Sequence, residues 1–457
     1  MKKILLLHAR GGAALEHALP RMAQHGELHV LAVQPMPTVT EALWRPACRS
    51  VTDISDERLS GPALVDRVVQ EAEALRADAV LTLSEHLVLV AAAATTCLGL
   101  RGAGSGAVRA RDKRLMRETW RTAGVPIPAF ASVGSPEELL GVVRELSPPL
   151  LLKSAWGAGS LGHLVIESER DARAAWSRCQ EALARAAAAF PLEYLHPDAS
   201  LDMLVEEMLE GDIDSWLPGS SGHADYLSVE GLVLDGTYHP LCIMARLPTI
   251  PPFTELGILA PCLLPDHLQK VVEEASREAV DALGLDTCAT HAELKLTADE
   301  GVVPIEVAAR FGGMMILRQI EEVFGLDPVA LLLQHLLGVP GRPPDRMLMT
   351  ADARAAAASV VLIGADARGR PWKDDDLVWD ASAVDWARLV SPASEVMPVP
   401  GLTVPNGSTF PRYRSTDGSR SAAGIAFLRS PDPDTLVRDA HGVIDGLESA
   451  VRAAQGR

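Results

Sequence analysis

Two short segments place acidic side chains inside stretches that otherwise have the pattern of buried strands. They read H-A-E-L-K-L (291–296) and I-E-V-A-A-R-F-G-G (305–313), separated by a turn signal. If residues 298–301 close the turn symmetrically, Glu293 lies directly opposite Glu306, with Cβ atoms about 5 Å apart. Two carboxylates repel at that distance unless a divalent cation lies between them. Oxygen ligands suit Mg²⁺ whose shell is completed by nucleotide phosphates.

The same register places His291 opposite Ala308 and Lys295 opposite Pro304. The alternative is a one-residue bulge at Gly301. Such a bulge would turn the second glutamate to the other face and leave two unrelated surface carboxylates. The spacing alone favours neither arrangement.

A glycine-rich loop, W-G-A-G-S-L-G-H (156–163), follows Lys153 at the end of an apolar strand. Glycines let the backbone approach a bulky anion, and consecutive N–H groups can hold phosphate oxygens. The loop lacks G-K-[ST] and precedes a strand, so it is not a Walker A loop. A plain hairpin tip is the alternative, and Lys153 favours phosphate binding.

Three further places could meet a substrate. In R-L-P-T-I-P-P-F-T-E-L-G (246–257), Arg246 suits a carboxylate and Glu255 an ammonium group, with a proline-rich connection as the equal alternative. Met314, directly after Gly313, suits an apolar pocket, with core packing as the alternative.

Three other residues have a functional and a structural interpretation. His291 could orient or deprotonate an amine, but a structural strand histidine is the favoured interpretation. Glu85 and His86 follow a strand of an alternating strand–helix region, at the sheet edge where ligands bind in open α/β folds. A solvated loop is the alternative for that pair.

Composition limits the class of protein. The chain has 457 residues, 48% of them hydrophobic and 22% charged, which is typical of several packed globular units. Six scattered cysteines predict reduced thiols, and with them a cytoplasmic location. The net charge of −18 argues against a nucleic-acid partner. The apolar runs are too short for a secretory signal or a membrane span.

Six motifs occur in an order that resembles the ATP-grasp superfamily, most closely its carboxylate–amine ligases of the L-amino-acid ligase type. They are D-K (112–113), G-V-P-x-P (124–128), P-L-L-L-K with the glycine loop (149–162), V-E-E-x-L-x-G (205–211), H-A-E (291–293) and I-E-x-x-x-R-x-G-G (305–313). The resemblance covers residues 1 to about 340. It implies a mixed α/β fold with an N-terminal Rossmann-like parallel-sheet domain, a mobile lid subdomain and a central antiparallel sheet.

The resemblance also implies domain limits and cofactors. The expected units are an N-terminal α/β domain (1–108), a linker helix with the lid (109–205), a central domain (206–344) and a small C-terminal lobe (345–457). ATP is the expected nucleotide, with Mg²⁺ or alternatively Mn²⁺. Amino acids are the expected substrates, and a homodimer is the expected assembly.

The residue roles follow by resemblance. Glu293 and Glu306 would hold the metal, and Arg310, Lys153 and Glu306 would act in catalysis. The residues expected at the nucleotide are Lys113, Lys153, Gly157, Gly159, Ser160, Gly162, Glu206, Glu207 and Leu209. Those expected at the substrates are Arg246, Glu255, His291, Arg310, Gly313 and Met314. Many relatives have asparagine where this chain has Ala308, which puts the number of metal ions in doubt.

The implied activity is ADP-forming ligation of a carboxylate, expected to be that of an amino acid, to an amine through an acyl phosphate. Alternatives with the same fold are a ligase for a non-amino-acid carboxylate in natural-product assembly, bicarbonate activation, and a non-catalytic nucleotide-binding protein.

Overall fold

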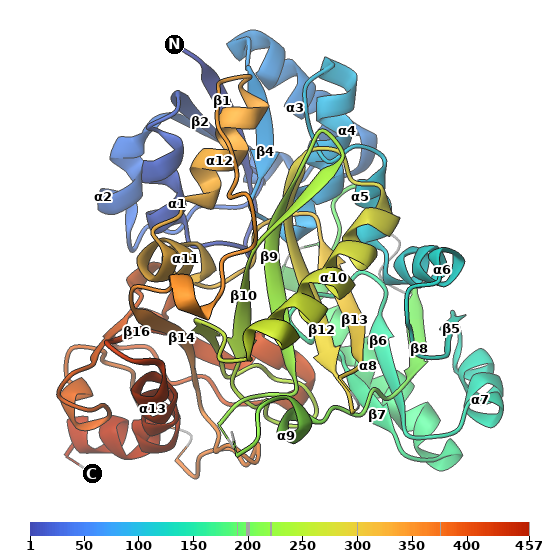
Figure 1. Ribbon diagram of the computed structural model, residues 1–457, viewed down its shortest axis with the longest axis vertical. Coiled ribbons are helices and arrows are strands. Elements are labelled where there is room, and N and C mark those ends of the chain that lie inside the picture. The colour runs from blue at the N-terminus through green and yellow to red at the C-terminus, as the bar shows by residue number, and fades with distance from the viewer. Residues whose placement is uncertain (190, 198–201, 220–221, 299, 375, 457) are drawn as a thin grey trace.

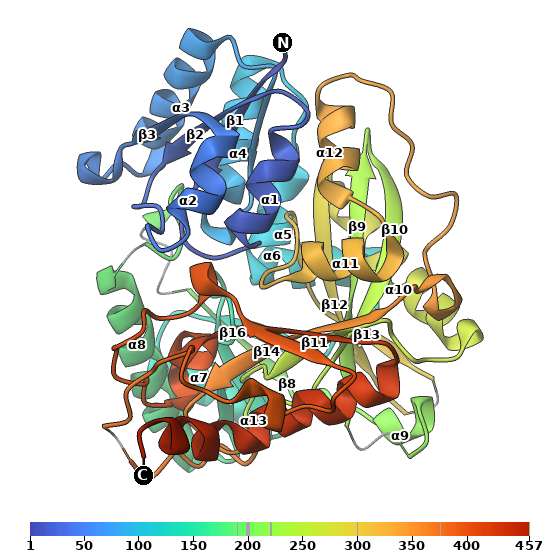
Figure 2. The same ribbon diagram turned by 90° about the vertical axis from the view of Figure 1, so that its left-hand side faces the viewer.

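A computed structural model describes residues 1–457 except 190, 198–201, 220–221, 299, 375 and 457. Within the described residues the strands form three sheets: a parallel sheet near the N-terminus, a long antiparallel sheet, and a small antiparallel sheet at one side. Figures 1 and 2 show the N-terminal sheet at one end of the molecule and the C-terminal helix α13 (Pro433–Ala454) at the other. The predicted mixed α/β class is confirmed.

The N-terminal sheet has the strand order β3-β2-β1-β4, and all of its strands are parallel. Its short apolar strands alternate with helices that cover them, as the sequence predicts. The strands are β1 (Lys3–His8), β2 (Glu27–Ala32), β3 (Cys48–Asp53) and β4 (Ala79–Thr82). The helices are α1 (Leu15–Met22), α2 (Glu41–Trp44), α3 (Gly61–Leu75) and α4 (Val88–Leu98).

The long sheet has the order β13-β12-β9-β10-β11-β14-β16-β15 among the described residues, and its neighbours are antiparallel. Its strands are β9 (Tyr226–Leu234), β10 (Thr237–Arg246), β11 (Gly257–Ala260), β12 (Cys288–Leu296), β13 (Val302–Ala308), β14 (Ala356–Ile363), β15 (Glu395–Pro398) and β16 (Ala422–Ser430). The predicted D-G hairpin joins β9 and β10. Asp235 and Gly236 both have positive φ there, as a tight two-residue turn requires.

The C-terminal segment extends this same sheet rather than standing apart from it. Strand β14 pairs with β11, and β16 pairs with β14. One hydrophobic core includes Val229 of β9, Leu428 of β16 and Leu447 of α13. Strands β14 and β16, which belong to the expected C-terminal lobe, therefore share their core with the central sheet. The four domain limits themselves stay predictions.

The small sheet, with the order β5-β8-β6-β7, forms the part of the chain expected to be the lid. Its elements are β5 (Phe130–Val133), α7 (Pro136–Glu145), β6 (Leu150–Ser154), β7 (Leu164–Ile166), α8 (Ala172–Ala189) and β8 (Met203–Glu207). It has its own apolar core, including Leu139, Leu152 and Leu183. A segment with a separate core can move as a unit, which is what a lid requires.

Helices connect these layers. Helix α10 crosses the long sheet in Figure 1, and α6 lies between that sheet and the lid. Asp112 caps α6 by accepting a hydrogen bond from the Arg114 N–H, and Gly124 ends the helix in the left-handed conformation, as its sequence predicts. The remaining helices are α5 (Gly106–Arg111), α6 (Lys113–Ala123), α9 (Ile213–Trp216), α10 (Asp266–Leu283), α11 (Ile316–Phe324) and α12 (Pro328–Leu336).

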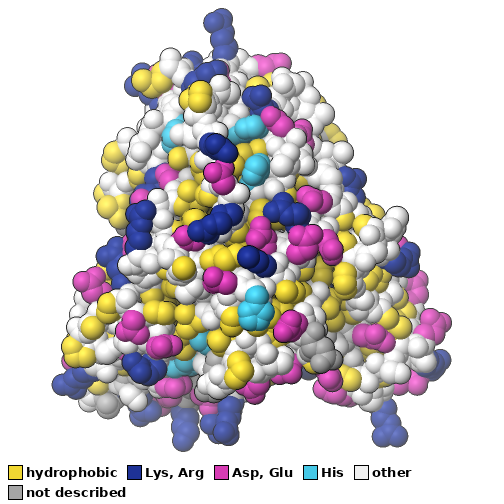
Figure 3. All heavy atoms as spheres, viewed as in Figure 1, with side chains coloured by type: hydrophobic (Ala, Val, Ile, Leu, Met, Phe, Trp, Pro, Cys, Tyr) yellow, Lys and Arg dark blue, Asp and Glu magenta, His cyan; other side chains and the backbone are white. Residues whose placement is uncertain are grey.

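All six cysteines are free thiols. On the face drawn in Figure 3, basic and acidic side chains are intermingled. Within the described ranges, none of the helices combines the length and the apolar character needed to cross a bilayer.

Candidate active site

The two opposed glutamates lie where the sequence predicts them, although the turn differs. Strands β12 and β13 pair Glu293 with Glu306 and His291 with Ala308. The prediction for Lys295 is wrong, because it pairs with Val303 rather than Pro304.

The physical reason is a pair of compensating irregularities. The turn is one residue tighter than a symmetric closure, since Leu296 pairs with Val302 and the Thr297 N–H donates to the Gly301 carbonyl at 2.8 Å. The register then shifts between Glu293 and Leu294, leaving Ile305 as the extra residue of β13. The bulge is therefore at Ile305, not at Gly301, and it restores the opposition of the two acids.

Both acids are partly exposed to solvent, and each has a cationic partner. The side chains of Glu293 and Glu306 are 26% and 22% exposed. Glu306 Oε1 accepts from Lys113 Nζ at 3.1 Å, and Glu293 Oε1 lies 3.3 Å from His291 Nε2. Burial raises the pKa of Glu293, but the hydrogen bond and charge of His291 outweigh it and lower that pKa to about 2. The carboxylate is ionised and ready to act as a hard oxygen ligand.

On the lid side, two buried lysines converge on the same space. Lys113, the first residue of α6, donates to the Gly157 carbonyl at 2.8 Å as well as to Glu306. Lys153, at the end of β6, donates to Glu206 Oε1, and Glu206 Oε2 accepts from Arg117 at 3.0 Å. Burial of Lys153 lowers its pKa to about 8 although Glu206 opposes the shift. The lysine retains its proton at neutral pH.

The glycine loop is tied to the C-terminal segment. Gly159, Ser160 and Gly162 all have positive φ. The Gly162 N–H donates to the Thr416 carbonyl at 2.9 Å, and the Ser419 N–H donates to the Gly159 carbonyl at 3.3 Å. A Cβ at Gly159 would lie 2.6 Å from Ser419 Oγ, which would have to turn away, and the φ of 63° also favours glycine here.

Two of the residues expected at the adenine have no contact with this cluster. Glu207 ends β8 on the face opposite to Glu206, and its N–H donates to the Ala129 carbonyl at 2.9 Å. Leu209 follows the strand and is half-buried. Their role at a nucleotide stays a prediction, while Glu206 is engaged with Lys153 and Arg117.

A second charged cluster lies on the long sheet, around His291 and Arg246. His291 Nδ1 lies 2.6 Å from Glu230 Oε1, which also accepts from Ser228 Oγ at 2.8 Å. Arg246 Nη2 donates to Ser228 Oγ at 2.9 Å, and its Nε lies 3.3 Å from Glu255. Against its burial, Glu230 and Glu293 raise the pKa of His291 to about 9. His291 is therefore protonated at neutral pH, so it acts as a donor that orients both acids rather than as a base.

The surroundings of Gly312 explain why a glycine is needed shortly after β13 ends. A Cβ there would lie 2.8 Å from both Glu230 Oε2 and His291 Nδ1. The next two residues lead into α11. Gly313 accepts from the Ile316 N–H at 3.4 Å, and Met314, with φ of 53°, accepts from the Ala14 N–H at 3.3 Å. Met314 is half-buried against the core, and its place in a pocket stays a prediction.

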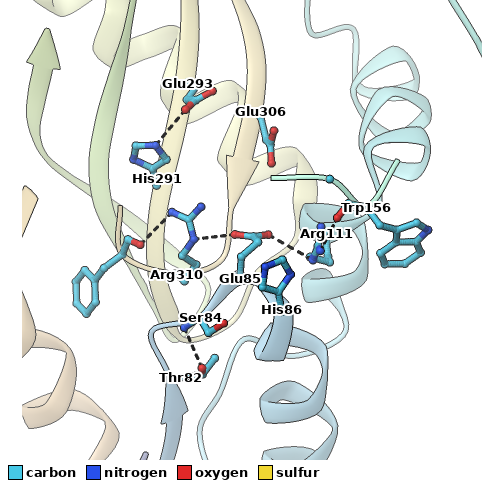
Figure 4. Close-up of polar contacts among 12 residues, drawn as sticks. Thr82, Ser84, Glu85, His86, Arg111, Trp156, His291, Glu293, Glu306 and Arg310 are labelled. Carbon is cyan, nitrogen blue, oxygen red and sulfur yellow. Dashed lines mark hydrogen bonds and ion pairs between the residues drawn. The ribbon is translucent and has the colours of Figure 1, made fainter. Parts of the chain in front are cut away.

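Arg310 links the sheet to the N-terminal domain. Figure 4 shows its guanidinium in contact with Glu85, and Nη1 donates to the Phe311 carbonyl. The distances are 2.7 Å from Nε to Glu85 Oε2 and 3.0 Å from Nη1 to the carbonyl. Glu85 and His86 are both buried, which contradicts the solvated-loop alternative.

Sequence reasoning did not single out Arg111, Arg117, Glu193, Ser228 or Glu230. Glu230 had a recognisable signal, because it is a lone carboxylate inside the apolar strand Y-L-S-V-E-G-L-V-L. The arginines lie on helices, where a surface position is the ordinary expectation.

The carboxylates of Glu293 and Glu306 fit a divalent cation that a bound ligand would also coordinate. Within the described part of the chain, no three His, Cys, Asp or Glu side chains form a complete metal cage. Two opposed carboxylates leave the other coordination positions to phosphate oxygens and water, as is usual for Mg²⁺ beside a nucleotide.

Comparison with known proteins gives relatives for part of the chain. No family profile matches the chain. It is 36% identical over 274 residues to an alanine–anticapsin ligase of Bacillus subtilis, an alignment that covers 60% of this chain and 57% of that ligase. A D-alanine–D-alanine ligase of Pseudomonas entomophila is 34% identical over 83 residues, 18% of this chain and 26% of the relative. The chain thus aligns with little more than half the length of the alanine–anticapsin ligase.

Solved structures match over the whole chain. An L-amino acid ligase from Bacillus licheniformis superimposes with a TM-score of 0.65 at 17% identity, covering 100% of this chain and 97% of that one. N5-carboxyaminoimidazole synthase from Aspergillus clavatus, solved with ADP and its ribonucleotide, gives a TM-score of 0.65 at 16% identity, covering 99% of each chain. The chain therefore has the ATP-grasp fold of these solved structures.

Proposed function

We propose that the protein is an ATP-dependent ligase that joins the carboxylate of one amino acid to the amine of a second. The γ-phosphoryl group of ATP would pass to the carboxylate, giving an acyl phosphate and ADP. The amine would then displace phosphate and form an amide. The observation that carries the proposal is the opposition of Glu293 and Glu306 beside Lys113, with Arg310 of the same strand–loop segment close by.

The chemistry requires this kind of site. A carboxylate does not react with an amine near neutral pH, because oxide is a poor leaving group, whereas phosphate leaves readily. Negative charge must be held on the phosphoryl oxygens during the transfer. The buried cations Lys113 and Lys153 suit that task, as does Arg310, whose side chain is 14% exposed. The closed glycine loop would keep water from the acyl phosphate.

Glu293 and Glu306 are the residues that would hold Mg²⁺, or Mn²⁺ in its place. A bound divalent ion supplies charge neutralisation at the phosphates. Lys113 keeps Glu306 in place, and His291 does the same for Glu293.

The sheet-side cluster supports an amino acid as the amine substrate. Arg246 is 1% exposed, and its Nη1 has no hydrogen-bond partner among the described residues. A buried donor without a partner is costly, so a ligand carboxylate is a suitable complement. Glu255, 3.3 Å from the same guanidinium, suits an ammonium group. The similarity to an alanine–anticapsin ligase and to a D-alanine–D-alanine ligase agrees with this class.

The test is release of phosphate from ATP across a panel of amino-acid pairs with Mg²⁺, with product mass measured for each pair that stimulates release. We expect at least one pair to give phosphate and a dipeptide mass in equal amounts. ATP binding without stimulation by any pair would instead favour a non-catalytic nucleotide-binding protein. Stimulation by bicarbonate or by a non-amino-acid carboxylate alone would change the substrate class.

A further inference from the structure

Glu85 is a buried carboxylate that the proposed chemistry does not use. It follows β4 of the N-terminal sheet and is 3% exposed. Its Oε2 lies 2.7 Å from Arg310 Nε, and its Oε1 lies 3.5 Å from Arg111 Nε. Burial raises its pKa, but the charges of Arg310 and Arg111 outweigh burial and hold it near 2. An ionised side chain is thus inserted between two guanidinium groups from other parts of the chain.

The contact restricts how Arg310 can turn. Glu85 forms a close ion pair with the guanidinium on its Nε side, and Nη1 donates a hydrogen bond to the Phe311 carbonyl. No hydrogen bond within the described residues involves Nη2. A free arginine side chain samples many rotamers, and holding it in one of them costs conformational entropy. Fixing it before the reaction lets it stabilise developing charge without reorganising.

The second guanidinium connects Glu85 to the lid. Arg111 donates from Nη2 to the carbonyls of Trp156 (2.7 Å) and Leu192 (2.8 Å), as Figure 4 shows for Trp156. Trp156 directly precedes the glycine loop, and Arg111 lies two positions before Lys113. Glu85 therefore touches the catalytic arginine on one side and the base of the phosphate-side elements on the other.

We propose that Glu85 is a positioning residue, which aims the guanidinium of Arg310 at the transferring phosphoryl group and holds it in register with the glycine loop. The proposal rests on the proposed ligase activity for its kinetic consequence. The orientation of Arg310 is a property of the protein alone.

Glu193 provides a matched control. Its Oε2 lies 3.0 Å from Arg111 Nε, it is 2% exposed, and it makes no ion pair with Arg310. Glu85→Gln and Glu193→Gln both remove a buried negative charge from Arg111. Only the first releases Arg310.

The kinetic experiment compares kcat and ATP affinity in the two variants. For Glu85→Gln we expect kcat to fall about 10- to 100-fold with ATP affinity within about threefold of wild type, because a small misplacement of a catalytic group acts on the transition state. Glu193→Gln should stay within about threefold in kcat. Equal losses in the two variants, or parallel losses of kcat and ATP affinity in Glu85→Gln, would overturn the proposal.

Glu85→Asp provides a second variant in case the amide variant does not fold. It keeps the charge but is one methylene too short for the 2.7 Å contact. We expect an intermediate kcat, about tenfold below wild type. Wild-type kcat in Glu85→Asp would contradict the positioning role.

A spectroscopic measurement separates this proposal from the proposed function. The ¹⁵N–¹H resonance of Arg310 Nε, assigned by its loss in Arg310→Lys, should exchange slowly in wild type and in Glu193→Gln, and should broaden or exchange fast in Glu85→Gln. If no amino-acid pair supports turnover, this result still decides the role of Glu85. An unchanged Arg310 resonance in Glu85→Gln would overturn it.

Discussion

The two charged clusters of the site differ in charge balance and in construction. On the phosphate side, Lys113, Lys153 and Arg117 face the carboxylates of Glu206 and Glu306, so cations are in excess. On the sheet side, the cations Arg246 and His291 face the three acids Glu230, Glu255 and Glu293. The excess positive charge on the phosphate side suits a polyphosphate. The excess negative charge on the sheet side suits a metal ion or an ammonium group.

Their construction differs as well. The phosphate-side residues come from α6, the lid sheet and β13, so their contacts cross between separate cores. The sheet-side residues come mainly from the adjacent strands β9, β10 and β12. The sheet-side cluster is therefore set by the register of one sheet, whereas the phosphate-side cluster depends on how the small sheet packs against the rest of the molecule.

The largest expected effect is at the point where the two clusters meet. Glu306→Gln should lower turnover by roughly a thousandfold, because it removes a charged metal ligand while leaving the strand intact. Steady-state phosphate release and a thermal melt would check both parts. Glu278→Gln, an exposed acid on α10, should leave both unchanged. Retained turnover in Glu306→Gln would remove that residue from the mechanism.

Lys153→Met tests the phosphate-side cluster without changing the sheet-side cluster. We expect ATP to bind about 10- to 100-fold more weakly, the usual cost of a charge-assisted hydrogen bond, with little change in amino-acid KM. Titration calorimetry with a non-hydrolysable ATP analogue measures this. Lys270→Met, at an exposed position of α10, is the control. A larger effect on the amino acid than on ATP would reverse the assignment of the two clusters.

Arg246→Met isolates the sheet side in the same way. The KM of the amine-donating amino acid should rise about 10- to 100-fold, while the KM of ATP stays within about threefold. The comparison requires saturating ATP and a varied second amino acid. If only ATP binding weakens, Arg246 does not face that substrate.

The pH dependence of stability distinguishes the clusters further. Glu230 and Glu293 raise the pKa of His291 from 6.5 to about 9. The protonated histidine therefore stabilises the folded state fully below pH 6.5, and this stabilisation is lost as the pH rises through 9. The contribution is at most about 3 kcal/mol. The free energy of unfolding of wild type minus that of His291→Asn should therefore decline between pH 6.5 and 9.5. A difference that stays flat or grows would contradict the charged form.

The smallest expected effect is at the lid contact with the C-terminal segment. Arg185 of α8 lies 2.8 Å from Asp417 and is 45% exposed. Arg185→Ala should raise the KM of ATP only about two- to threefold, since exposed ion pairs contribute about 0.2–1 kcal/mol. Arg173→Ala, on the same helix but paired with Glu137 inside the lid, is the control. An equal effect of the two variants would mean that the lid, not its contact, was disturbed.

Much of the fold could be read from local patterns. The parallel N-terminal sheet, helix α6 with its Gly124 stop, the glycine loop and both hairpins follow from periodicity and turn residues within short windows. The opposition of Glu293 and Glu306 is one of the two arrangements that the spacing allows, and the chain adopts it, but not through the symmetric turn. A tighter turn and the bulge at Ile305 cancel, and no local signal shows either.

The partners of the charged residues could not be predicted in this way. Lys153 and Glu206 are 53 positions apart, and Glu85 and Arg310 far more. The union of the C-terminal strands with the central sheet is another long-range fact, decided by the pairing of β11 with β14. Each depends on how separate segments pack together.

The sequence by itself determined which residues could do chemistry and the elements that carry them, because side-chain type and hydrophobic spacing act over a few residues. Only the tertiary structure decided which charges neutralise one another, which remain open to a ligand, and that His291 is held as a cation. Burial and distant partners set ionisation and orientation, and both arise only when the chain has folded.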